Sequence, residues 1–378
     1  MTLYGVVDTG YRSVTSGDNK FSGMANGNNS SNRLGFKGTE DLGNSLKANF
    51  VLEGDLTPND GTAAGLAFKR QSTVGLSGNF GEVRLGRDYT PAFRVFGIVD
   101  PFGTVGVGSA GNIMWSTVVG VGGSPSSQDV QDFAGTFTTL AKATATGSAP
   151  AGVTTARATI ADPNLVRANN SFAYYSPSYN GFSAAAMYSA GVQNTYSLKN
   201  QGKMTGLSGT YVNGPLTVAL ATQETKGGWT QAQGTGLNLT TGTDDQKMTT
   251  NFLAGSYNFG MLTAAAGYRT EKLVDASMTA AKSNSAIYSL SAPVGAVTLK
   301  ASYITKKAEA AYFTEGSIKA GNQVAVGAVY DLSKRTAFYA TYAVLKNEAG
   351  FANNVGSAAA SADGVKSKGF DIGVRHNF

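Results

Sequence analysis

The sequence predicts an all-β fold, a 16-stranded antiparallel transmembrane β-barrel that forms a single domain over residues 1–378. Three observations carry this prediction. Apolar and polar residues alternate in one run after another along the chain. Tight turns and long polar connections alternate between those runs. No window of 18 or more residues is both apolar and free of helix breakers, which excludes a transmembrane helix.

Each run is long enough to cross a bilayer as a tilted strand, which needs about 9–11 residues. The predicted strands are residues 2–13, 30–39, 45–56, 65–77, 81–88, 167–176, 181–190, 202–212, 215–224, 247–257, 260–271, 283–291, 295–306, 321–331, 335–346 and 366–378. The alternative is a soluble sandwich of two sheets. A sandwich would need buried inner faces, and strands less dominated by small polar residues on one parity.

Gly, Pro and Asn-Gly supply the dihedral angles of the tight turns. These turns are "EDLGNS" (40–45), "GNFGE" (78–82), "SPSYNG" (176–181), "VNGPL" (212–216), "YNFGM" (257–261), "SAPVGA" (291–296) and "DLSKR" (331–335). The long connections are residues 14–29, 57–64, 89–166, 191–201, 225–246, 272–282, 307–320 and 347–365. An even strand number with turns at one end and loops at the other is typical of outer-membrane barrels.

Aromatic residues gather near the predicted strand ends, as expected for girdles at two membrane interfaces. Those near the turns are Tyr179, Phe182, Tyr257, Phe259, Phe338 and Phe378, and those toward the loops are Tyr188, Tyr268, Tyr303 and Tyr342. Ordinary β-propensity of aromatic residues explains part of this pattern.

The stretch "SNRLGFKGTEDLG" (31–43) shows which face of a strand meets water. Arg33 and Lys37 share one parity, and Leu34 and Phe36 share the other. A Lys or Arg that faces mid-bilayer lipid costs about 2–4 kcal/mol, so the two cations should face a wet lumen. Sixteen strands leave a channel that side chains cannot fill.

Composition excludes several classes of function. Charged residues make up only 14% of the chain, and there is no Cys, which removes disulfides, thiol nucleophiles and Cys-ligated zinc. The net charge of +6 suggests anionic partners, but no Lys/Arg-rich run indicates a nucleic-acid arm. Strand-like sequence begins within three residues of Met1. The sequence as given therefore predicts either a cytosolic protein or a mature form with an added start Met.

Four stretches give the chain a resemblance to the general porins of Gram-negative outer membranes, especially the anion-selective β-proteobacterial branch. They are "TLYGVVDTGY" (2–11), "NRLGFKGTEDLG" (32–43), "FKRQSTVGLSGNFGEVRLGRDY" (68–89) and the ending "GFDIGVRHNF" (369–378). The resemblance implies a homotrimer of barrels in the outer membrane, in contact with its lipids and lipopolysaccharide, each narrowed by an inward-folded third loop. It also implies that Phe378 is a signal for the barrel assembly machinery.

The resemblance further implies a pore constriction at which arginines on the barrel wall face the third loop. Carried over by motif, the wall arginines are Arg33, Arg70 and Arg167. The loop tip resembles "RVFGIVDPFG" (94–103), so Arg94 belongs to it and Asp100 takes the acidic role. Glu53, Asn49 and Asp8 have inward parity and are expected at the same level. Further cations of inward parity would extend a basic track: Arg12, Lys37, Arg269, Lys300, Lys306 and Arg375.

Two departures from the family pattern bear on the site. The connection 89–166 is very long, so residues 112–165 are expected to rise outside the barrel or to pack in its vestibule. Arg70 shares parity with the apolar residues Val74 and Leu76. A position at the interface between subunits therefore stays open for Arg70 as the alternative to a position in the lumen. Small residues such as Thr73 and Gly75 would then face outward against a neighbouring barrel.

These expectations add up to a water-filled channel for small hydrophilic solutes that prefers small anions and needs no cofactor or metal. A channel specific for phosphate, organic acids or sugars, and an adhesin or antigen role of the loops, stay open as alternatives. An enzymatic barrel would need a Ser or Asp beside a His. The single histidine, His376, has lipid or interface parity at the turn end of the last strand. "GVGSAG" (106–111) lacks the strand-turn-helix context of a dinucleotide site.

Overall fold

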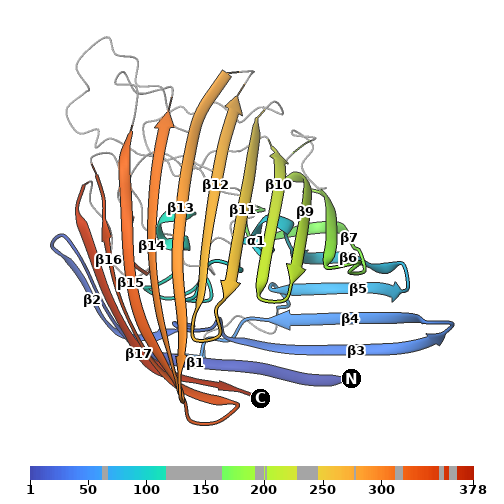
Figure 1. Ribbon diagram of the computed structural model, residues 1–378, viewed down its shortest axis with the longest axis horizontal. Helices are drawn as coiled ribbons and strands as arrows, with labels where there is room; N and C mark the ends of the chain where they lie inside the picture. Colours follow the sequence, from blue (N-terminus) through green and yellow to red (C-terminus); the bar gives the residue numbers. More distant parts are fainter. Residues whose placement is uncertain are drawn as a thin grey trace.

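Seventeen strands form one closed antiparallel sheet in the computed structural model of the chain, shown in Figure 1. The structure describes residues 1–61, 67–115, 164–191, 200, 202–227, 246–275, 278–310, 318–348, 353–356 and 364–378. Consecutive strands pair along the chain, except that β2 and β3 both pair with β1, and β1 also pairs with β17, so the sheet closes on itself. Closure satisfies the backbone groups that lipid could not.

The first eight strands run from the amino-terminus to just beyond the third loop. They are β1 (Thr2–Ser16), β2 (Asn19–Asn26), β3 (Arg33–Gly43), β4 (Leu46–Gly54), β5 (Gln71–Gly78), β6 (Gly81–Tyr89), β7 (Arg167–Tyr175) and β8 (Phe182–Ala190). The others are β9 (Lys203–Asn213), β10 (Leu216–Lys226), β11 (Lys247–Asn258), β12 (Thr263–Asp275), β13 (Met278–Val294), β14 (Val297–Ala310), β15 (Ile318–Asp331), β16 (Thr336–Lys346) and β17 (Lys366–Asn377).

The seventeen strands occupy sixteen positions around the barrel, which confirms the predicted architecture. β2 and β3 share one position beside β1: β2 pairs with residues 9–16 and β3 with residues 2–6. The prediction of one loop over residues 14–29 was therefore wrong, because β1 continues to Ser16 and turns back at once into β2. Between β2 and β3, residues 27–32 form no strand; these residues are called the 27–32 segment below.

The predicted tight turns join consecutive strands at the end of the barrel that also holds both chain termini (Figure 1). Residues 295–296, for example, connect β13 and β14 with Gly295 at a φ of 62°. At the other end, the predicted loop 272–282 is mostly strand, since β12 continues to Asp275 and β13 begins at Met278. Phe378 closes the barrel by exchanging two backbone hydrogen bonds with Gly5, of 3.0 and 3.1 Å.

The outer face of the barrel is apolar, as the parity argument predicted. All ten aromatic residues assigned to the two girdles are exposed. Val218, Leu220, Leu299 and Tyr303 also point outward, whereas their inward neighbours Ala219 and Ser302 are buried. Among the described residues, no helix is long and apolar enough to cross a membrane.

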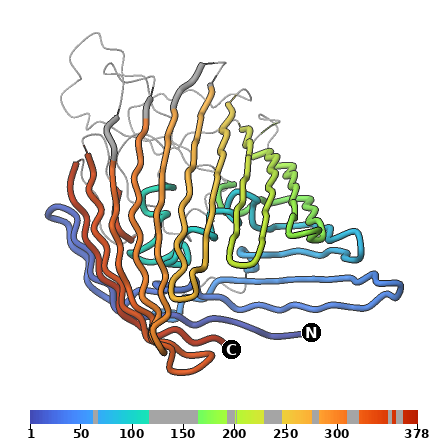
Figure 2. Tube along the Cα trace, in the orientation of Figure 1, coloured from blue at the N-terminus to red at the C-terminus, as the bar shows by residue number. Residues whose placement is uncertain are grey.

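The third loop leaves β6 and folds into the barrel, where Figure 2 shows its first part in teal inside the ring of strands. It forms α1 (Pro91–Phe96) and α2 (Gly111–Met114). The Thr90 hydroxyl caps α1 by accepting from Phe93 N at 3.3 Å. Residues 116–163 lie outside the described part of the chain, so the expectation for most of 112–165 is not tested.

An apolar cluster attaches the third loop to one side of the barrel wall. Phe96 and Ile113 of the loop are buried in the same cluster as Phe252, Ile287 and Ile304 of β11, β13 and β14. Burial of such side chains contributes about 1.5–3 kcal/mol each. The loop therefore fills the lumen on the side of β10–β15 and leaves open space toward β3–β7.

Polar groups of the wall add hydrogen bonds to the backbone of the same loop. Asp371 of β17 accepts from Val107 N at 2.9 Å, and Gln323 of β15 donates to Ser109 O at 2.9 Å. The cations Arg269 and Lys306 both donate to Met114 O, at 2.7 and 3.0 Å. These contacts fix the loop at three successive places along its path.

Asp100 folds the tip of the loop. Its carboxylate accepts from Phe102 N and from Ala110 N, both at 3.0 Å. Burial raises the pKa of Asp100 to about 6, against the opposing effect of these two backbone donors and of Lys300. The structure thus assigns Asp100 to the loop itself and not to a contact with the wall arginines.

The raised pKa makes the contribution of Asp100 to stability depend on pH. A carboxyl whose folded-state pKa exceeds its unfolded value contributes stability that is complete below about pH 4 and is lost as pH rises through about 6. Relative to the variant Asp100→Asn, the wild type should lose up to about 3 kcal/mol of unfolding free energy between pH 4 and pH 7, at ~1.4 kcal/mol per pKa unit. Denaturant unfolding of both purified proteins across this range measures the difference. A difference independent of pH would mean that Asp100 titrates at its ordinary pKa.

Candidate functional site: the pore constriction

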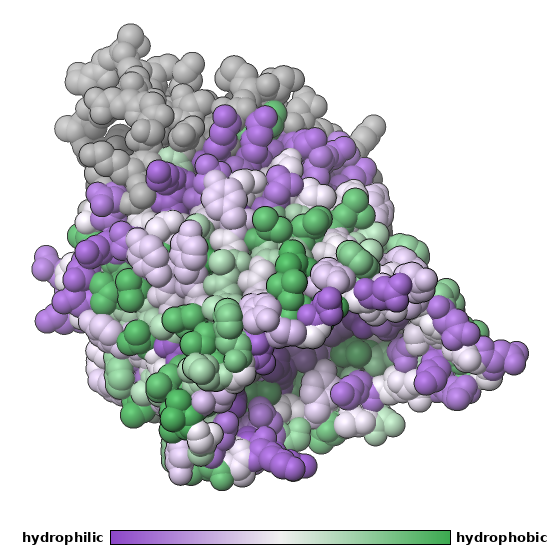
Figure 3. All heavy atoms as spheres, viewed as in Figure 1, coloured by the Kyte–Doolittle hydropathy of each residue, from purple (hydrophilic) through white to green (hydrophobic). Residues whose placement is uncertain are grey.

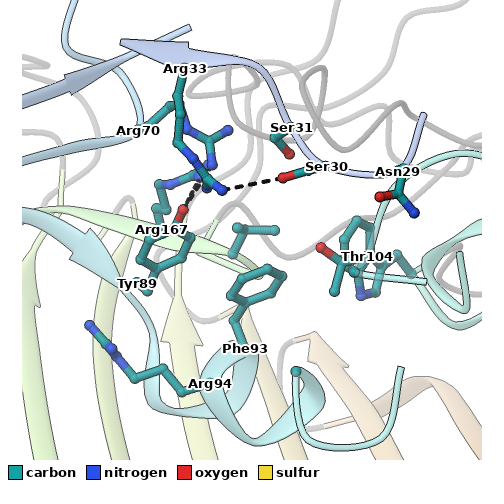
Figure 4. A pocket seen from close by; sticks show the side chains of 14 residues that line it. Asn29, Ser30, Ser31, Arg33, Arg70, Tyr89, Phe93, Arg94, Thr104 and Arg167 are labelled. Atoms are coloured by element: carbon teal, nitrogen blue, oxygen red, sulfur yellow. Dashed lines mark hydrogen bonds between the residues drawn. The ribbon is translucent and has the colours of Figure 1, made fainter. Parts of the chain in front are cut away.

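A cavity of about 410 Å³ lies in the lumen between the third loop, the 27–32 segment and the wall strands β3–β7 (Figure 4). Its lining includes four arginines and no acidic residue. The lining residues are Asn29, Ser30, Ser31, Arg33, Arg70, Tyr89, Phe93, Arg94, Gly97, Gly103, Thr104, Trp115, Val166 and Arg167. The three wall arginines predicted from sequence motifs thus meet at one place.

Arg70 is buried, with 2% of its surface exposed, and its charge is balanced. Its Nε donates to Glu53 at 2.8 Å, and one terminal nitrogen donates to Asp55 at 3.2 Å. The other terminal nitrogen donates to the Tyr89 hydroxyl at 3.0 Å. Glu53 also accepts from the Tyr4 hydroxyl at 3.1 Å.

Arg70 reaches the lumen because β5 begins only at Gln71, so parity cannot be extended back from Val74 to Arg70. The subunit-interface reading of Arg70 is wrong for the same reason. Within β5, Val74 and Leu76 face outward and Thr73 is buried. The expectation that Thr73 points outward is therefore also wrong.

Arg167 is equally buried but has no carboxylate partner among the residues that the structure describes. It is 3% exposed, and one terminal nitrogen donates to the Tyr89 hydroxyl at 2.7 Å. Its guanidinium lies 4.3 Å from the centroid of the Tyr89 ring. Among the residues that the structure describes, its Nε and other terminal nitrogen have no hydrogen-bond partner. A buried cation with free donors is energetically costly unless an anion or water completes it.

Arg33 is the second cation without an acidic partner in the described part of the chain. It donates to the Ser30 hydroxyl at 3.2 Å, so the 27–32 segment orients it toward the cavity (Figure 4). Arg94, from α1, is instead paired with Asp88 at 3.0 Å and lies 4.9 Å from the Tyr175 ring. Arg33 and Arg167 therefore contribute unbalanced positive charge, whereas Arg70 and Arg94 do not.

Asp8 lies on the inner wall as predicted, but it contacts none of the four arginines. Its carboxylate accepts from Asn29 N at 2.8 Å, from Ser30 N at 2.6 Å and from the Tyr339 hydroxyl at 2.5 Å. Asp8 thereby holds the 27–32 segment in the lumen. The predicted inward residue Asn49 bonds to Thr39 and Ser77 on the neighbouring strands.

The expected basic track is only partly present. Arg12, Arg269 and Lys306 are buried. Arg12 pairs with Asp371 at 2.7 Å, and Arg269 pairs with Glu271 at 2.6 Å. All three are buried and paired with carboxylates, and Arg269 and Lys306 also donate to the third-loop backbone, so they do not form an open track.

The other cations of that set stay partly accessible. Lys37 lies 5.2 Å from the ring of Tyr4. Arg375 donates to Asn29 at 2.8 Å and is 3.8 Å from Asp331. Lys300 is half-buried near the tip of the third loop. His376 is exposed on the outer face, where its Nδ1 lies 2.8 Å from the Thr336 hydroxyl.

Sequence reasoning missed Tyr89, Asp88 and the 27–32 segment. Tyr89 holds Arg70 and Arg167 together and stacks on Phe93, with 5.4 Å between ring centroids. Asp88 positions Arg94 and Arg84. The stretch "GRDYTP" (86–91), a strand followed by a capped helix start, is the local signal that could have drawn attention to them.

Comparison with known proteins agrees with this geometry. A family model described as Gram-negative porin matches residues 1–350. The whole chain is 33% identical to outer membrane porin protein 32 of Delftia acidovorans and 29% identical to an outer membrane porin protein of Bordetella pertussis, and it covers 94% of each.

Solved structures give the same result. An anion-selective porin from Comamonas acidovorans is similar at a TM-score of 0.77 and 30% identity, over 100% of this chain and 99% of that one. The trimer form of OmpT from Vibrio cholerae has a TM-score of 0.66 at 16% identity over 100% of this chain and 98% of that one, which shows the shared fold. The chain belongs to the Gram-negative porins, the channel-forming β-barrels of the outer membrane.

Proposed function

We propose that this porin is a passive diffusion channel that prefers small anions, and that Arg33 and Arg167 are the main source of this preference. The single observation that carries the proposal is that both guanidiniums line the narrow cavity without a carboxylate partner among the described residues. The anion-selective porin from Comamonas acidovorans, at 30% identity, supports it.

Electrostatics in a wet pore filters ions without trapping them. Two unit charges 4 Å apart interact by about 1 kcal/mol in bulk water and by about 4 kcal/mol near a protein surface. Arginine also stays charged at any working pH and presents a planar fork of donors that suits carboxylate, phosphate or sulfate. Selectivity should weaken with salt, because the Debye length is about 8 Å at physiological ionic strength.

We propose that Arg70, Arg94, Glu53 and Asp8 hold the constriction in shape, and that Asp100 does so through the tip of the third loop. Their ionic or hydrogen-bond partners lie within the barrel, so they add little net field at the cavity. Lys37, Lys300 and Arg375 are partly accessible and extend the positive field along the lumen.

We also propose the assembly that the family resemblance implies. Porin homologues are trimers, and the exposed apolar residues Val74, Leu76 and Leu85 on β5 and β6 give this chain an outer surface suited to another barrel. Phe378, exposed beside Gly5, would be read by the barrel assembly machinery. Light scattering of the detergent-solubilised protein tests the trimer.

A channel specific for phosphate or organic acids is the second candidate. Two nitrogens of the buried Arg167 that have no partner in the described part of the chain favour it, because they could complete their hydrogen bonds with an oxyanion. Saturation of anion flux at millimolar phosphate or dicarboxylate would support this candidate, and flux that rises linearly with concentration would support the general channel. The adhesin or antigen role concerns loops that lie largely outside the described residues.

The double variant Arg33→Gln/Arg167→Gln should lose most of the preference for anions, because it removes the two unbalanced charges. We expect the chloride-to-potassium permeability ratio to fall several-fold, as expected from about 1–4 kcal/mol per close charge pair. Reversal potentials of planar bilayers under a KCl gradient measure it. Lys366→Gln/Lys368→Gln removes the same charge from the exposed outer face of β17 and should change nothing. Cation preference in the wild type, or equal effects of both variants, would contradict the proposal.

The variant Tyr89→Phe tests how the arginines are held. It removes the hydroxyl that accepts from both Arg70 and Arg167 but keeps the aromatic ring beneath Arg167. Leaving two buried donors unpaired should cost about 1–3 kcal/mol of unfolding free energy. The permeability ratio should fall less than in the double arginine variant, because both charges remain. Denaturant unfolding and the same bilayer assay measure the two effects, and a stability equal to that of the wild type would argue against a positioning role.

A further inference from the structure

The 410 Å³ cavity has aromatic rings in its lining as well as cations. Tyr89, Phe93 and Trp115 line it together with the four arginines. Phe93 stacks on Tyr89, with 5.4 Å between the ring centroids and 10° between the ring planes. The centroid of Phe93 is also 6.0 Å from that of Trp115. In Figure 4, the Phe93 side chain extends from α1 toward the part of the cavity where Arg33 and Arg167 lie.

Helix α1 places Phe93 in the lumen by dividing its residues between two sides. Ala92, Val95 and Phe96 are buried, and they attach the helix to the apolar cluster on the barrel wall. Phe93 stays partly exposed and lines the cavity, as does Gly97 one turn later. The anchoring of the helix therefore holds one phenyl ring on the path of a solute.

The aromatic girdles, by contrast, lie on the other face of the barrel. Figure 3 shows the outer wall, where hydrophobic or pale side chains cover the middle. Exposed rings such as Tyr303 and Phe338 belong to this outer surface. A solute in the lumen does not meet those rings, but it passes Phe93. A ring in this place attracts a solute only if the solute has apolar or aromatic surface of its own.

The arginines beside these rings supply charge for the same solute. Arg33 is partly exposed and is oriented toward the cavity by Ser30, so its guanidinium can meet a carboxylate directly. Arg167 is buried against the Tyr89 ring, 4.3 Å from its centroid, and adds a second positive charge. Hydrogen bonds from arginine to a carboxylate are charge-assisted and stronger than neutral ones. A carboxylate attached to a planar ring can therefore contact the cations and the aromatic rings at once.

The size of the cavity suits a solute with a single ring. A volume of about 410 Å³ lies within the ~300–1,000 Å³ of typical small-molecule sites. Chloride and phosphate carry charge but no ring, so they engage only the arginines. A neutral aromatic molecule engages only the rings.

We propose that this cavity recognises aromatic monocarboxylates, of which benzoate is the simplest, in preference to aliphatic or inorganic anions of the same charge. The carboxylate lies against Arg33, and the ring lies against Phe93. The inference rests on the proposed anion channel and gives it a substrate class. The site is half open to the lumen, so a bound solute is delayed and then released.

Inhibition of the chloride current by benzoate in planar bilayers tests the proposal, with cyclohexanecarboxylate as the matched probe. Both probes carry one carboxylate on a six-membered ring and are ionised at pH 7, but only benzoate has a flat aromatic face. At a fixed KCl concentration, the half-inhibiting concentration of benzoate should be about three- to tenfold lower, the size of effect expected from one aromatic pair. Hydrophobicity alone would favour the saturated ring.

This comparison of two probes needs only the wild type. Equal inhibition by the two acids, or stronger inhibition by cyclohexanecarboxylate, would overturn the proposal. Reversal potentials of the same channels under a KCl gradient test the anion channel separately. Chloride preference without a difference between the two acids would therefore contradict the aromatic site alone.

Three variants locate the effect. Phe93→Leu removes the ring but keeps an apolar side chain, so it should abolish the difference between the two acids. Phe93→Tyr keeps the ring and should retain the difference. The matched control Phe338→Leu removes an exposed phenyl ring from the outer face of β16 and should also retain it. Persistence of the difference in Phe93→Leu, or its loss in either of the other two variants, would overturn the proposal.

The double variant Arg33→Gln/Arg167→Gln tests the cationic half of the site. Its half-inhibiting concentration of benzoate should rise about tenfold or more, because the carboxylate loses both charges. An unchanged value would show that benzoate acts elsewhere and would overturn the proposal.

Discussion

The attachment of the third loop to one side of the barrel is the constraint on which the rest of the pore depends. The apolar cluster around Phe96 and Ile113 holds the loop against β10–β15, and Asp371, Arg269 and Lys306 fix its backbone. With that side filled, water and solutes are confined to the side of β3–β7. The wall arginines stand on this side, so the position of the loop determines which of the many inward cations meet a passing ion.

Charge balance then separates the cations into two groups. Those that face the loop or a neighbouring strand are paired with carboxylates, as Arg12 is with Asp371 and Arg70 with Glu53. Arg33 and Arg167 face the open cavity and have no such partner among the described residues. In a chain with a net charge of +6, the cations of this cavity without a carboxylate partner among the described residues are thus Arg33 and Arg167. Tyr89 is neutral and joins the two groups, because it accepts hydrogen bonds from Arg70 and Arg167 alike.

The barrel could be predicted almost completely from the sequence, because lipid imposes a strict alternation of side chains and closure leaves few choices of strand order. The meeting of Arg33, Arg70 and Arg167 could also be predicted, although only by motif. Strand parity gave the wrong orientation for Arg70, because β5 begins at Gln71, one residue after Arg70 in the chain. The fate of Arg269, Lys306 and Asp100 could not be predicted. It depends on the path of a loop whose contacts, such as that of Lys306 with Met114 O, span almost two hundred residues of chain. Alternation identifies inward cations but does not say whether water or protein lies in front of them.

The shared position of β2 and β3 has a consequence for how such channels can diverge. The 27–32 segment enters the lumen opposite the third loop, and Gly103 and Gly106 of that loop come close to the carbonyl groups of Asn29 and Asn28. Two segments therefore bound the opening, the long third loop and the 27–32 segment of six residues, and they contact each other. Substitutions at Ser30 and Ser31, whose side chains line the cavity, can alter its hydrogen-bonding groups without changing strand number or register. A family of channels with different solute preferences can therefore arise on one unchanged barrel.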